Sequence, residues 1–285
     1  MGVPYAEVIG DPIAHSKSPS IHEFWLHQLG LDGGYGASQV KAKGDGLSIY
    51  LNLARRDPDW MGCNVTAPHK RAVLPLVDRL TPEASSIGAA NVVFRDGTTL
   101  IGHNTDSAGF LEPLRLLLAQ HHHGRTAVII GAGGAARAVA HALIGQDFTI
   151  AVAARDKAAA DALLSELNGV GYAYALSQLE QPALFGFAGG RAGLLDLLVN
   201  ATPAGMEGRQ PLQLNWDHFP AQTVAYDLVY APPNTPLLKA AQRRGHPVID
   251  GLGMLIAQAA LAFERFFGQP APREHDAELR ALITA

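Results

Sequence analysis

The sequence predicts an α/β protein in which an N-terminal α/β domain is followed by a doubly wound parallel sheet. Short apolar runs alternate with helical segments along most of the chain, which is typical of parallel sheets covered by helices. The apolar run at residues 127–130 leads directly into the glycine-rich turn at residues 131–134 and then into a helix start. More than a hundred residues precede that turn, and a chain of 285 residues is long enough for two ordinary domains.

Composition restricts the class of protein. Hydrophobic residues make up 48% of the chain and charged residues 17%, which is typical of a globular protein with a large core. The net charge of −4 gives no electrostatic basis for nucleic-acid binding. No apolar run reaches membrane-spanning length, and the N-terminus lacks the basic and apolar regions of a signal peptide. The single cysteine, Cys63, excludes an internal disulfide framework and is expected to be a small buried residue. We therefore expect a cytoplasmic protein without nucleic-acid or membrane partners.

The first half of the chain is expected to contain short strands and two longer helices. Ser18 and Pro19 begin a helix that ends at Leu29, with Ser18 as N-cap and Pro19 at the first helical position. Asp96-Gly97 is a strong turn signal and predicts a hairpin. A helix from Ser107 to Gln120 is expected to lead into the second half. Strands are expected at residues 5–9, 60–63, 91–94 and 98–101.

The second half begins with the strongest local motif. Gly131, Gly133 and Ala136 match the G-x-G-x-x-G/A spacing of dinucleotide-binding turns. The first glycine permits the tight turn, the second lets the backbone approach a pyrophosphate, and the small third residue lets helix and strand pack closely. The phosphates are then expected at the helix N-terminus. The turn alone is a weak signal, because glycine-rich turns also occur where no nucleotide binds.

The same alternation of strands and helices continues to the end of the chain. His121-His122-His123, just before the glycine-turn strand, is expected to be a solvated linker. Parallel strands are expected at residues 127–130, 148–153, 195–200, 223–229 and 247–250, and helices at 157–167 and 254–267.

Two titratable residues have both a structural and a chemical interpretation. Lys70 lies in the first turn of a helix that begins at Pro68, where a lysine is usually a solvated surface charge. Next to a second titratable group, it would instead serve as a general acid or base. Asp106 is a candidate for that group. However, Asn104, Thr105 and Asp106 are all N-cap residue types before an apolar helix.

Other polar residues have similar alternatives. Ser16 and Ser18 offer two hydroxyls at a helix N-terminus, suited to a carboxylate, although Ser18 also serves as a simple cap. The Asn91 amide either forms hydrogen bonds with the backbone or binds a ligand. The Gln258 side chain either forms a hydrogen bond with a neighbouring residue or faces a ligand. Asn64 and Thr66 lie where the strand at 60–63 gives way to a loop.

Eight short motifs occur in one order between about residues 5 and 268, and this order closely resembles the shikimate dehydrogenase family. They are Ser16-Lys-Ser-Pro19, Asn64-Val-Thr-Ala-Pro-His-Lys70, Gly88-Ala-Ala-Asn91, Asn104-Thr-Asp106, the glycine turn, Asn200-Ala-Thr-Pro-Ala-Gly-Met206, Asp227-Leu-Val-Tyr230 and Gly251-Leu-Gly-Met-Leu-Ile-Ala-Gln258.

The resemblance implies a fold and an activity. It implies reversible oxidation of shikimate to 3-dehydroshikimate with NADP, a step in chorismate and aromatic amino-acid biosynthesis. Residues 1–106, completed by 253–285, would form the substrate domain. Residues 107–252 would form a Rossmann-type dinucleotide domain, and the C-terminal helices would return to the first domain. The protein is expected to be a monomer or homodimer and to bind no metal.

The resemblance also assigns residues by motif. Lys70 and Asp106 would be the catalytic pair. The substrate would be bound by Ser16, Ser18, Asn64, Thr66, Asn91, Tyr230 and Gln258, and the dinucleotide by Gly131, Gly133, Gly134, Ala135, Arg155, Thr202, Gly251 and Met254.

The cofactor turn departs from the family pattern. Many members that use NADP have an arginine here and a second one three residues later, whereas this chain has Arg155 followed by Asp156 and Lys157. Arg155 is suited to a 2′-phosphate. Asp156 would repel that phosphate or accept a hydrogen bond from an unphosphorylated ribose. NADP is expected to be preferred and NAD remains possible. The alternatives are an NAD-preferring quinate/shikimate or aminoshikimate-type dehydrogenase, and a non-catalytic shikimate-sensing protein.

Overall fold

The computed structural model describes residues 2–119, 125–167, 171–180 and 195–285, and the expected His121–His123 linker lies outside them. Contacts divide the chain into two compact units. Unit 1 comprises Met1–Gly109 and Ile256–Ala285, and unit 2 comprises Phe110–Leu255. The chain crosses between them within α5 (Asp106–Leu111) and again within α10 (Gly251–Phe267), a few residues after the boundaries drawn from the sequence.

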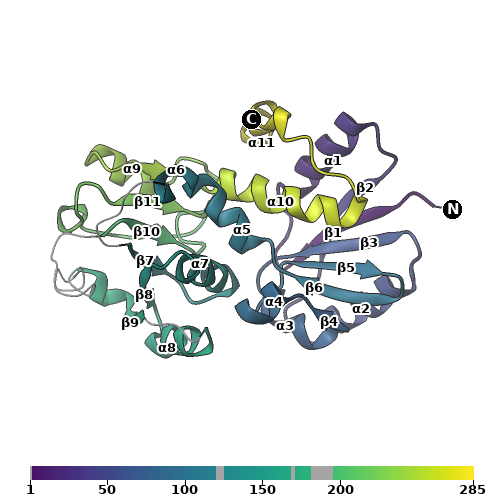
Figure 1. Cartoon of the computed structure of the whole chain (residues 1–285), viewed down its shortest axis with the longest axis horizontal. Coiled ribbons are helices and arrows are strands. Elements are labelled where there is room, and N and C mark those ends of the chain that lie inside the picture. Colours follow the sequence, from purple (N-terminus) through teal and green to yellow (C-terminus); the bar gives the residue numbers. More distant parts are fainter. Residues whose placement is uncertain (1, 120–124, 168–170, 181–194) are drawn as a thin grey trace. The chain divides into compact units, whose positions relative to one another are not determined.

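Unit 1 contains a six-stranded mixed sheet in the order β2-β1-β3-β5-β6-β4 (Figure 1). β1 is parallel to β2 and β3, whereas β5 is antiparallel to β3 and β6. Its strands are β1 (Tyr5–Gly10), β2 (Gly34–Gln39), β3 (Trp60–Val65), β4 (Arg79–Leu80), β5 (Val92–Asp96) and β6 (Thr99–His103). Its helices are α1 (Ser18–Leu29), α2 (Gly46–Arg56), α3 (His69–Ala72), α4 (Pro82–Ile87) and α11 (Asp276–Thr284), with short 3₁₀ turns at Leu74–Leu76 and Arg273–His275.

Side chains of β1 alternate between two cores. Ala6 and Val8 pack with Phe266 of α10, whereas Ile9 packs on the opposite face with Leu51 of α2. This is the two-residue period of a strand covered on both sides. Because α10 supplies one of these cores, the C-terminal part of the chain completes unit 1, as the family resemblance implied.

Unit 2 is a fully parallel sheet in the order β12-β11-β10-β7-β8-β9, which is the doubly wound Rossmann order (Figure 1). Its strands are β7 (Thr126–Ile130), β8 (Thr149–Ala154), β9 (Gly171–Ala175), β10 (Leu197–Asn200), β11 (Val224–Asp227) and β12 (Val248–Ile249). Its helices are α6 (Arg115–Leu118), α7 (Gly134–Ile144), α8 (Lys157–Glu166) and α9 (Pro236–Arg243), with 3₁₀ turns at Glu112–Leu114, Leu176–Glu180 and Trp216–His218.

The central strand of unit 2 explains the apolar run in the sequence. Every residue of β7 is buried, with Ala127 and Ile129 in one core and Val128 and Ile130 in the other. A strand covered by helices on both faces carries a continuous apolar run instead of an alternating pattern.

Two predictions of local structure are wrong. The helix expected from Ser107 onward is interrupted, since α5 gives way to a 3₁₀ turn at Glu112–Leu114 before α6 begins. Pro113 lies in that turn and has no N–H to continue the helical hydrogen bonds. Ser18 is not the N-cap of α1. It is the first helical residue, and its backbone N–H donates to the Ser16 hydroxyl at 3.3 Å.

No helix in the described part of the chain is both long enough and apolar enough to cross a membrane. Cys63 is a free, fully buried residue, and burial raises the pKa of its thiol.

Candidate active site

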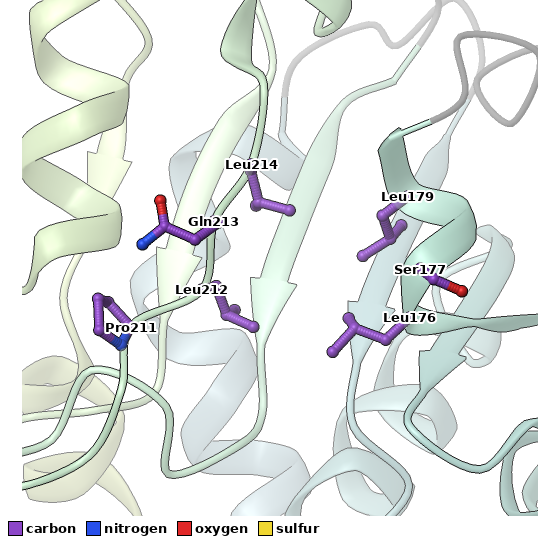
Figure 2. Close-up of a pocket in the computed structure, with 7 residues that line it drawn as sticks. All are labelled: Leu176, Ser177, Leu179, Pro211, Leu212, Gln213 and Leu214. Atoms are coloured by element: carbon purple, nitrogen blue, oxygen red, sulfur yellow. The ribbon is translucent and has the colours of Figure 1, made fainter.

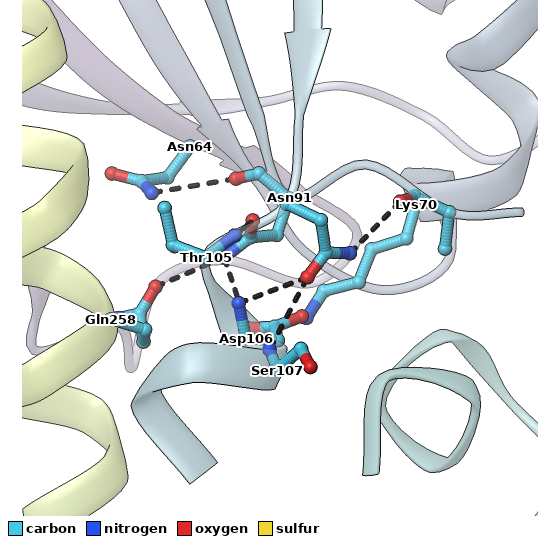
Figure 3. A network of polar contacts seen from close by, with 9 residues as sticks. Asn64, Lys70, Asn91, Thr105, Asp106, Ser107 and Gln258 are labelled. Carbon is cyan, nitrogen blue, oxygen red and sulfur yellow. Dashed lines mark hydrogen bonds and ion pairs between the residues drawn. The ribbon is translucent and has the colours of Figure 1, made fainter. Parts of the chain in front are cut away.

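Lys70 and Asp106 form a close ion pair in unit 1 (Figure 3). Lys70 lies on α3, directly after β3, and Asp106 is the first residue of α5, after β6. The Lys70 Nζ lies 2.6 Å from Asp106 Oδ2, and the side chains are only 16% and 5% exposed. The interpretation of Lys70 as a solvated surface charge is therefore wrong.

Asn104 performs the capping function that Asp106 was also suited to. Its Oδ1 accepts hydrogen bonds from the backbone N–H groups of Asp106, at 3.0 Å, and Ser107, at 3.4 Å. Its Nδ2 donates to the carbonyl of Ala89 at 2.8 Å. Because Asn104 satisfies the start of α5, the Asp106 carboxylate is available to other side chains.

Asn91 connects this pair to the residues around it (Figure 3). Its Oδ1 accepts from the Thr105 backbone N–H at 2.7 Å. Its Nδ2 lies 2.9 Å from both Asp106 Oδ1 and Thr105 Oγ1, and 3.2 Å from Gln258 Oε1. An amide NH₂ has two protons for these three acceptors. The three acceptors therefore share the two amide protons of Asn91.

Asn64 lies beside this network and is held by a residue that the sequence did not indicate. The Tyr35 hydroxyl donates to Asn64 Oδ1 at 2.5 Å, while Asn64 Nδ2 makes a long 3.4 Å contact with the Asn91 carbonyl. Tyr35 on β2 and Asn64 on β3 flank β1 on its two sides. Only the strand order brings them together, so no local pattern marks Tyr35.

The remaining predicted substrate residues of unit 1 do not bond to this network. Thr66 is half-buried directly after β3, and Ser18 is buried at the start of α1. Within the described residues, neither hydroxyl has a side-chain hydrogen bond, so both are free to bind a ligand. Ser16 already accepts from the Ser18 N–H.

The glycine turn of unit 2 fits a pyrophosphate. Gly131 has φ 119°, and a Cβ there would lie 3.0 Å from both the Ala201 carbonyl oxygen and Thr202 Cγ2. A Cβ on Gly133 would enter open space. Gly133 is the N-cap of α7 and offers no side chain to bind the first N–H groups of that helix, which begins at Gly134 and Ala135. Open space above uncapped N–H groups is what an anion needs at a helix N-terminus.

The turn after β8 presents one unpaired cation. Arg155 is exposed and makes no ion pair within the described part of the chain. Asp156 is the N-cap of α8 and accepts from the Ala158 N–H at 3.0 Å, while Lys157 pairs with Asp161 at 2.8 Å. Arg155 is therefore the residue of this turn whose positive charge has no ion-pair partner among the described residues, and Asp156 has a structural function in addition to its charge.

The other predicted dinucleotide residues differ in accessibility. Thr202 follows β10 and is half-buried, and Gly251 is buried at the start of α10. Tyr230, which was predicted to bind the substrate, is half-buried after β11. Met254 is 7% exposed and belongs to the core between the sheet and α7. Its predicted contact with a dinucleotide rests on the motif alone.

An apolar hollow of about 290 Å³ lies elsewhere in unit 2 (Figure 2). None of the predicted site residues lines it. The lining residues are Leu176, Ser177, Leu179, Pro211, Leu212, Gln213 and Leu214.

Comparisons with known proteins agree with the motif order. Residues 8–93 match the family model for the shikimate dehydrogenase substrate binding domain. Residues 116–183 match the model for shikimate / quinate 5-dehydrogenase, and residues 251–278 the shikimate 5'-dehydrogenase C-terminal domain. The chain is 48% identical to the shikimate dehydrogenase (NADP(+)) of Sphingopyxis alaskensis, over 99% of this chain and 97% of that protein. The chain belongs to the shikimate dehydrogenase family.

Solved structures related to this shikimate dehydrogenase family member share its fold. The Thermus thermophilus shikimate 5-dehydrogenase, in complex with NADP(H) and shikimate, has a TM-score of 0.82 and 36% identity, covering 98% of this chain and 99% of that one. The quinate dehydrogenase of Corynebacterium glutamicum, in complex with NAD, has a TM-score of 0.84 and 30% identity, covering 98% of each chain.

Proposed function

We propose that the protein is an NADP-dependent shikimate dehydrogenase, an oxidoreductase that interconverts 3-dehydroshikimate and shikimate in chorismate biosynthesis. The observation that carries this proposal is the buried Lys70–Asp106 pair with Asn91 against it. The Sphingopyxis relative, 48% identical over nearly the whole chain, supports the same activity. Unit 1 would bind the substrate and unit 2 the dinucleotide.

The chemistry assigns separate functions to the two residues of the pair. NADP, when bound, supplies the hydride acceptor for carbon 3 of shikimate. In its neutral amine form Lys70 accepts the proton that leaves the substrate hydroxyl during oxidation, and the ammonium so formed returns that proton during reduction. Asp106 orients the hydroxyl and keeps the lysine in place. At a separation of 2.6 Å the Asp106 carboxylate is close enough to hold the Lys70 side chain by a direct ion pair.

Substrate recognition follows from the donors and acceptors nearby. Ser16 and Ser18 would hold the carboxylate, with Tyr230 close to it. Asn64, Thr66, Asn91 and Gln258 would hold the ring hydroxyls. Ser18 and Thr66 support this assignment because their hydroxyls have no side-chain partner among the described residues.

Dinucleotide binding would use the glycine turn and its neighbours. Gly131, Gly133, Gly134 and Ala135 would cradle the pyrophosphate, and Arg155 would bind the 2′-phosphate. Thr202, Gly251 and Met254 would line the nicotinamide site.

We further propose that the enzyme acts in the cytoplasm on a small molecule, as a monomer or homodimer and without a nucleic-acid partner. The net charge of −4 supports the absence of nucleic-acid binding.

A steady-state matrix tests the proposed function. Shikimate and quinate are each assayed with NADP and with NAD, and kcat/KM is compared across the four combinations. We expect shikimate with NADP to give the highest value. No oxidation of shikimate with either cofactor would contradict the proposal.

A second candidate is an NAD-preferring quinate/shikimate dehydrogenase. It is favoured by the single unpaired cation, Arg155, described in the turn after β8, and by the likeness to the Corynebacterium quinate dehydrogenase with NAD. In the same matrix it predicts that NAD exceeds NADP. A non-catalytic sensor would give no turnover, and the intact Lys70–Asp106 pair argues against it.

A further inference from the structure

A buried carboxylate that the proposed reaction does not use lies at the carboxyl end of β11. Asp227 is fully buried and accepts hydrogen bonds from three donors. These are Asn200 Nδ2 at 2.8 Å and the Val229 N–H at 3.0 Å, both to Oδ1, and the Thr235 hydroxyl at 2.6 Å, to Oδ2. Asn200 stands directly opposite Asp227 in the parallel register of β10 and β11.

The contact with Asp227 fixes which way the Asn200 amide points. Besides Asp227, Asn200 Nδ2 donates to the Ala204 carbonyl at 3.1 Å. Asn200 Oδ1 accepts from the Thr202 hydroxyl at 2.7 Å and from the Thr202 N–H at 3.1 Å. A flipped amide would place its oxygen against a carboxylate and a carbonyl, neither of which can donate. The donor and acceptor capacity of Asn200 is thus fully used in one orientation.

Thr202 is the residue that this orientation holds. Its hydroxyl donates to Asn200 and accepts from the Ala204 N–H at 3.2 Å, which leaves one lone pair for a donor on a ligand. Thr202 also lies against the glycine turn, since its Cγ2 is 3.0 Å from where a Gly131 Cβ would be. Hydrogen bonds therefore run from a buried carboxylate, through an amide, to the edge of the predicted pyrophosphate site.

The charge state of Asp227 suits this function. Burial raises the pKa of Asp227 to about 6, and the hydrogen bonds from Thr235, Val229 and Asn200 oppose that rise. All three groups that contact the carboxylate are donors, which suits an ionised Asp227, and an ionised acceptor strengthens the hydrogen bond from Asn200.

We propose that Asp227 is a positioning residue for the dinucleotide, because it orients Asn200 and Asn200 holds Thr202 beside the glycine turn. This proposal rests on the proposed function only in taking the dinucleotide to bind at that turn. Asp227 itself touches neither the substrate nor the reacting atoms.

The test compares NADP affinity among three variants. Asp227→Ala removes the acceptor for Asn200. Asp227→Asn keeps an oxygen that can accept from Asn200 and Val229, while the Thr235 hydroxyl can turn to accept from the new NH₂. Thr223→Val is the matched control, because Thr223 lies just before the opposite end of β11 and its buried hydroxyl donates to the Leu195 carbonyl at 2.7 Å.

The dissociation constant of NADP is measured by calorimetry without shikimate, and melting temperatures are recorded in parallel. We expect Asp227→Ala to weaken NADP binding roughly tenfold, as for loss of a charge-assisted hydrogen bond. We expect Asp227→Asn to recover most of that affinity, and Thr223→Val to leave it unchanged whatever its melting temperature.

The proposal would be overturned if the NADP dissociation constants of Asp227→Ala and Thr223→Val differed by less than about twofold, because a difference that small is expected of substitutions without a specific effect. Equal losses in Asp227→Ala and Thr223→Val would also overturn it. Asp227→Ser, which leaves room for a water, replaces Asp227→Ala if that variant does not fold, with the same expectations. Turnover of shikimate by the wild-type protein is measured separately. A wild-type protein that binds NADP but does not oxidise shikimate would contradict the proposed reaction and would leave this inference unaffected.

Discussion

At the scale of single residues, Ser16 and not Ser18 is the serine whose hydroxyl binds a backbone N–H near the start of α1. Ser16 uses its oxygen to accept the Ser18 N–H, whereas the Ser18 hydroxyl is unused within the described residues. A substitution at Ser18 therefore tests ligand binding more cleanly than one at Ser16.

Ser18→Ala is expected to raise KM for shikimate roughly tenfold, as for loss of a hydrogen bond to a charged group. KM for NADP and the melting temperature should stay near the wild-type values. Steady-state kinetics with each substrate varied in turn, together with a thermal melt, make the measurement. A similar rise in both KM values would show that the hydroxyl acts through structure instead.

Arg155 carries the prediction for cofactor choice. Arg155→Ala is expected to lower kcat/KM for NADP by roughly ten- to a hundredfold, because it removes a charge-assisted contact with the 2′-phosphate. The value for NAD should change little, and Lys239→Ala, at an exposed lysine of α9, is the control. If NADP and NAD lose activity equally, Arg155 does not read the phosphate.

Asp156 needs a different substitution because it caps α8. Asp156→Ser removes the negative charge but keeps a side-chain oxygen for the cap. Any change in the NADP/NAD ratio then reports the charge alone.

At the scale of elements, a buried histidine where α1 packs on β2 and α10 makes the free energy of unfolding depend on pH. His22 on α1 is fully buried and stacks on Tyr35 of β2, with ring centroids 3.9 Å apart, and lies 5.8 Å from Phe263 of α10. Neither of its ring nitrogens has a hydrogen-bond partner within the described residues. Burial lowers the pKa of His22 to about 3, from 6.5 in an exposed histidine.

His22 is therefore expected to make the fold less stable in acid. Between pH 6.5 and 3 the unfolded chain binds a proton at this histidine and the folded chain does not, so the free energy of unfolding falls as the pH decreases. At pH 5 the loss from this group is about 2 kcal/mol. Urea unfolding at pH 7 and pH 5 should show that much extra loss in the wild type relative to His22→Leu. Equal losses in the two proteins would mean that His22 is protonated in the fold.

At the scale of the whole molecule, the parts predicted from sequence are those set by local pattern. The buried run before Gly131 predicted β7, and Gly133 is found at the start of α7, because burial on both faces and tight turns leave direct marks in the sequence. The order of eight motifs predicted the family, which the similarity to the Sphingopyxis enzyme confirms.

The parts that were missed depend on long-range contacts. Asn104, Thr105 and Asp106 are equivalent as cap residues in sequence, and only the bond from Asn104 to the Ala89 carbonyl explains why Asn104 caps α5. Tyr35 reaches Asn64 only through the order of strands in the sheet. The ligand functions assigned to individual residues by motif remain predictions until the substitutions above are made.

The most direct test of the proposed function is a double-mutant cycle on Lys70 and Asp106, read as kcat for shikimate oxidation with NADP. Lys70→Ala is expected to lower kcat on the order of 10²-fold or more, as for loss of a general acid or base. Because the two side chains act as one unit at 2.6 Å, the double variant should be about as impaired as the more impaired single variant. Single effects that multiply in the double variant, or a folded Lys70→Ala protein with near wild-type kcat, would contradict the assignment of this pair to proton transfer.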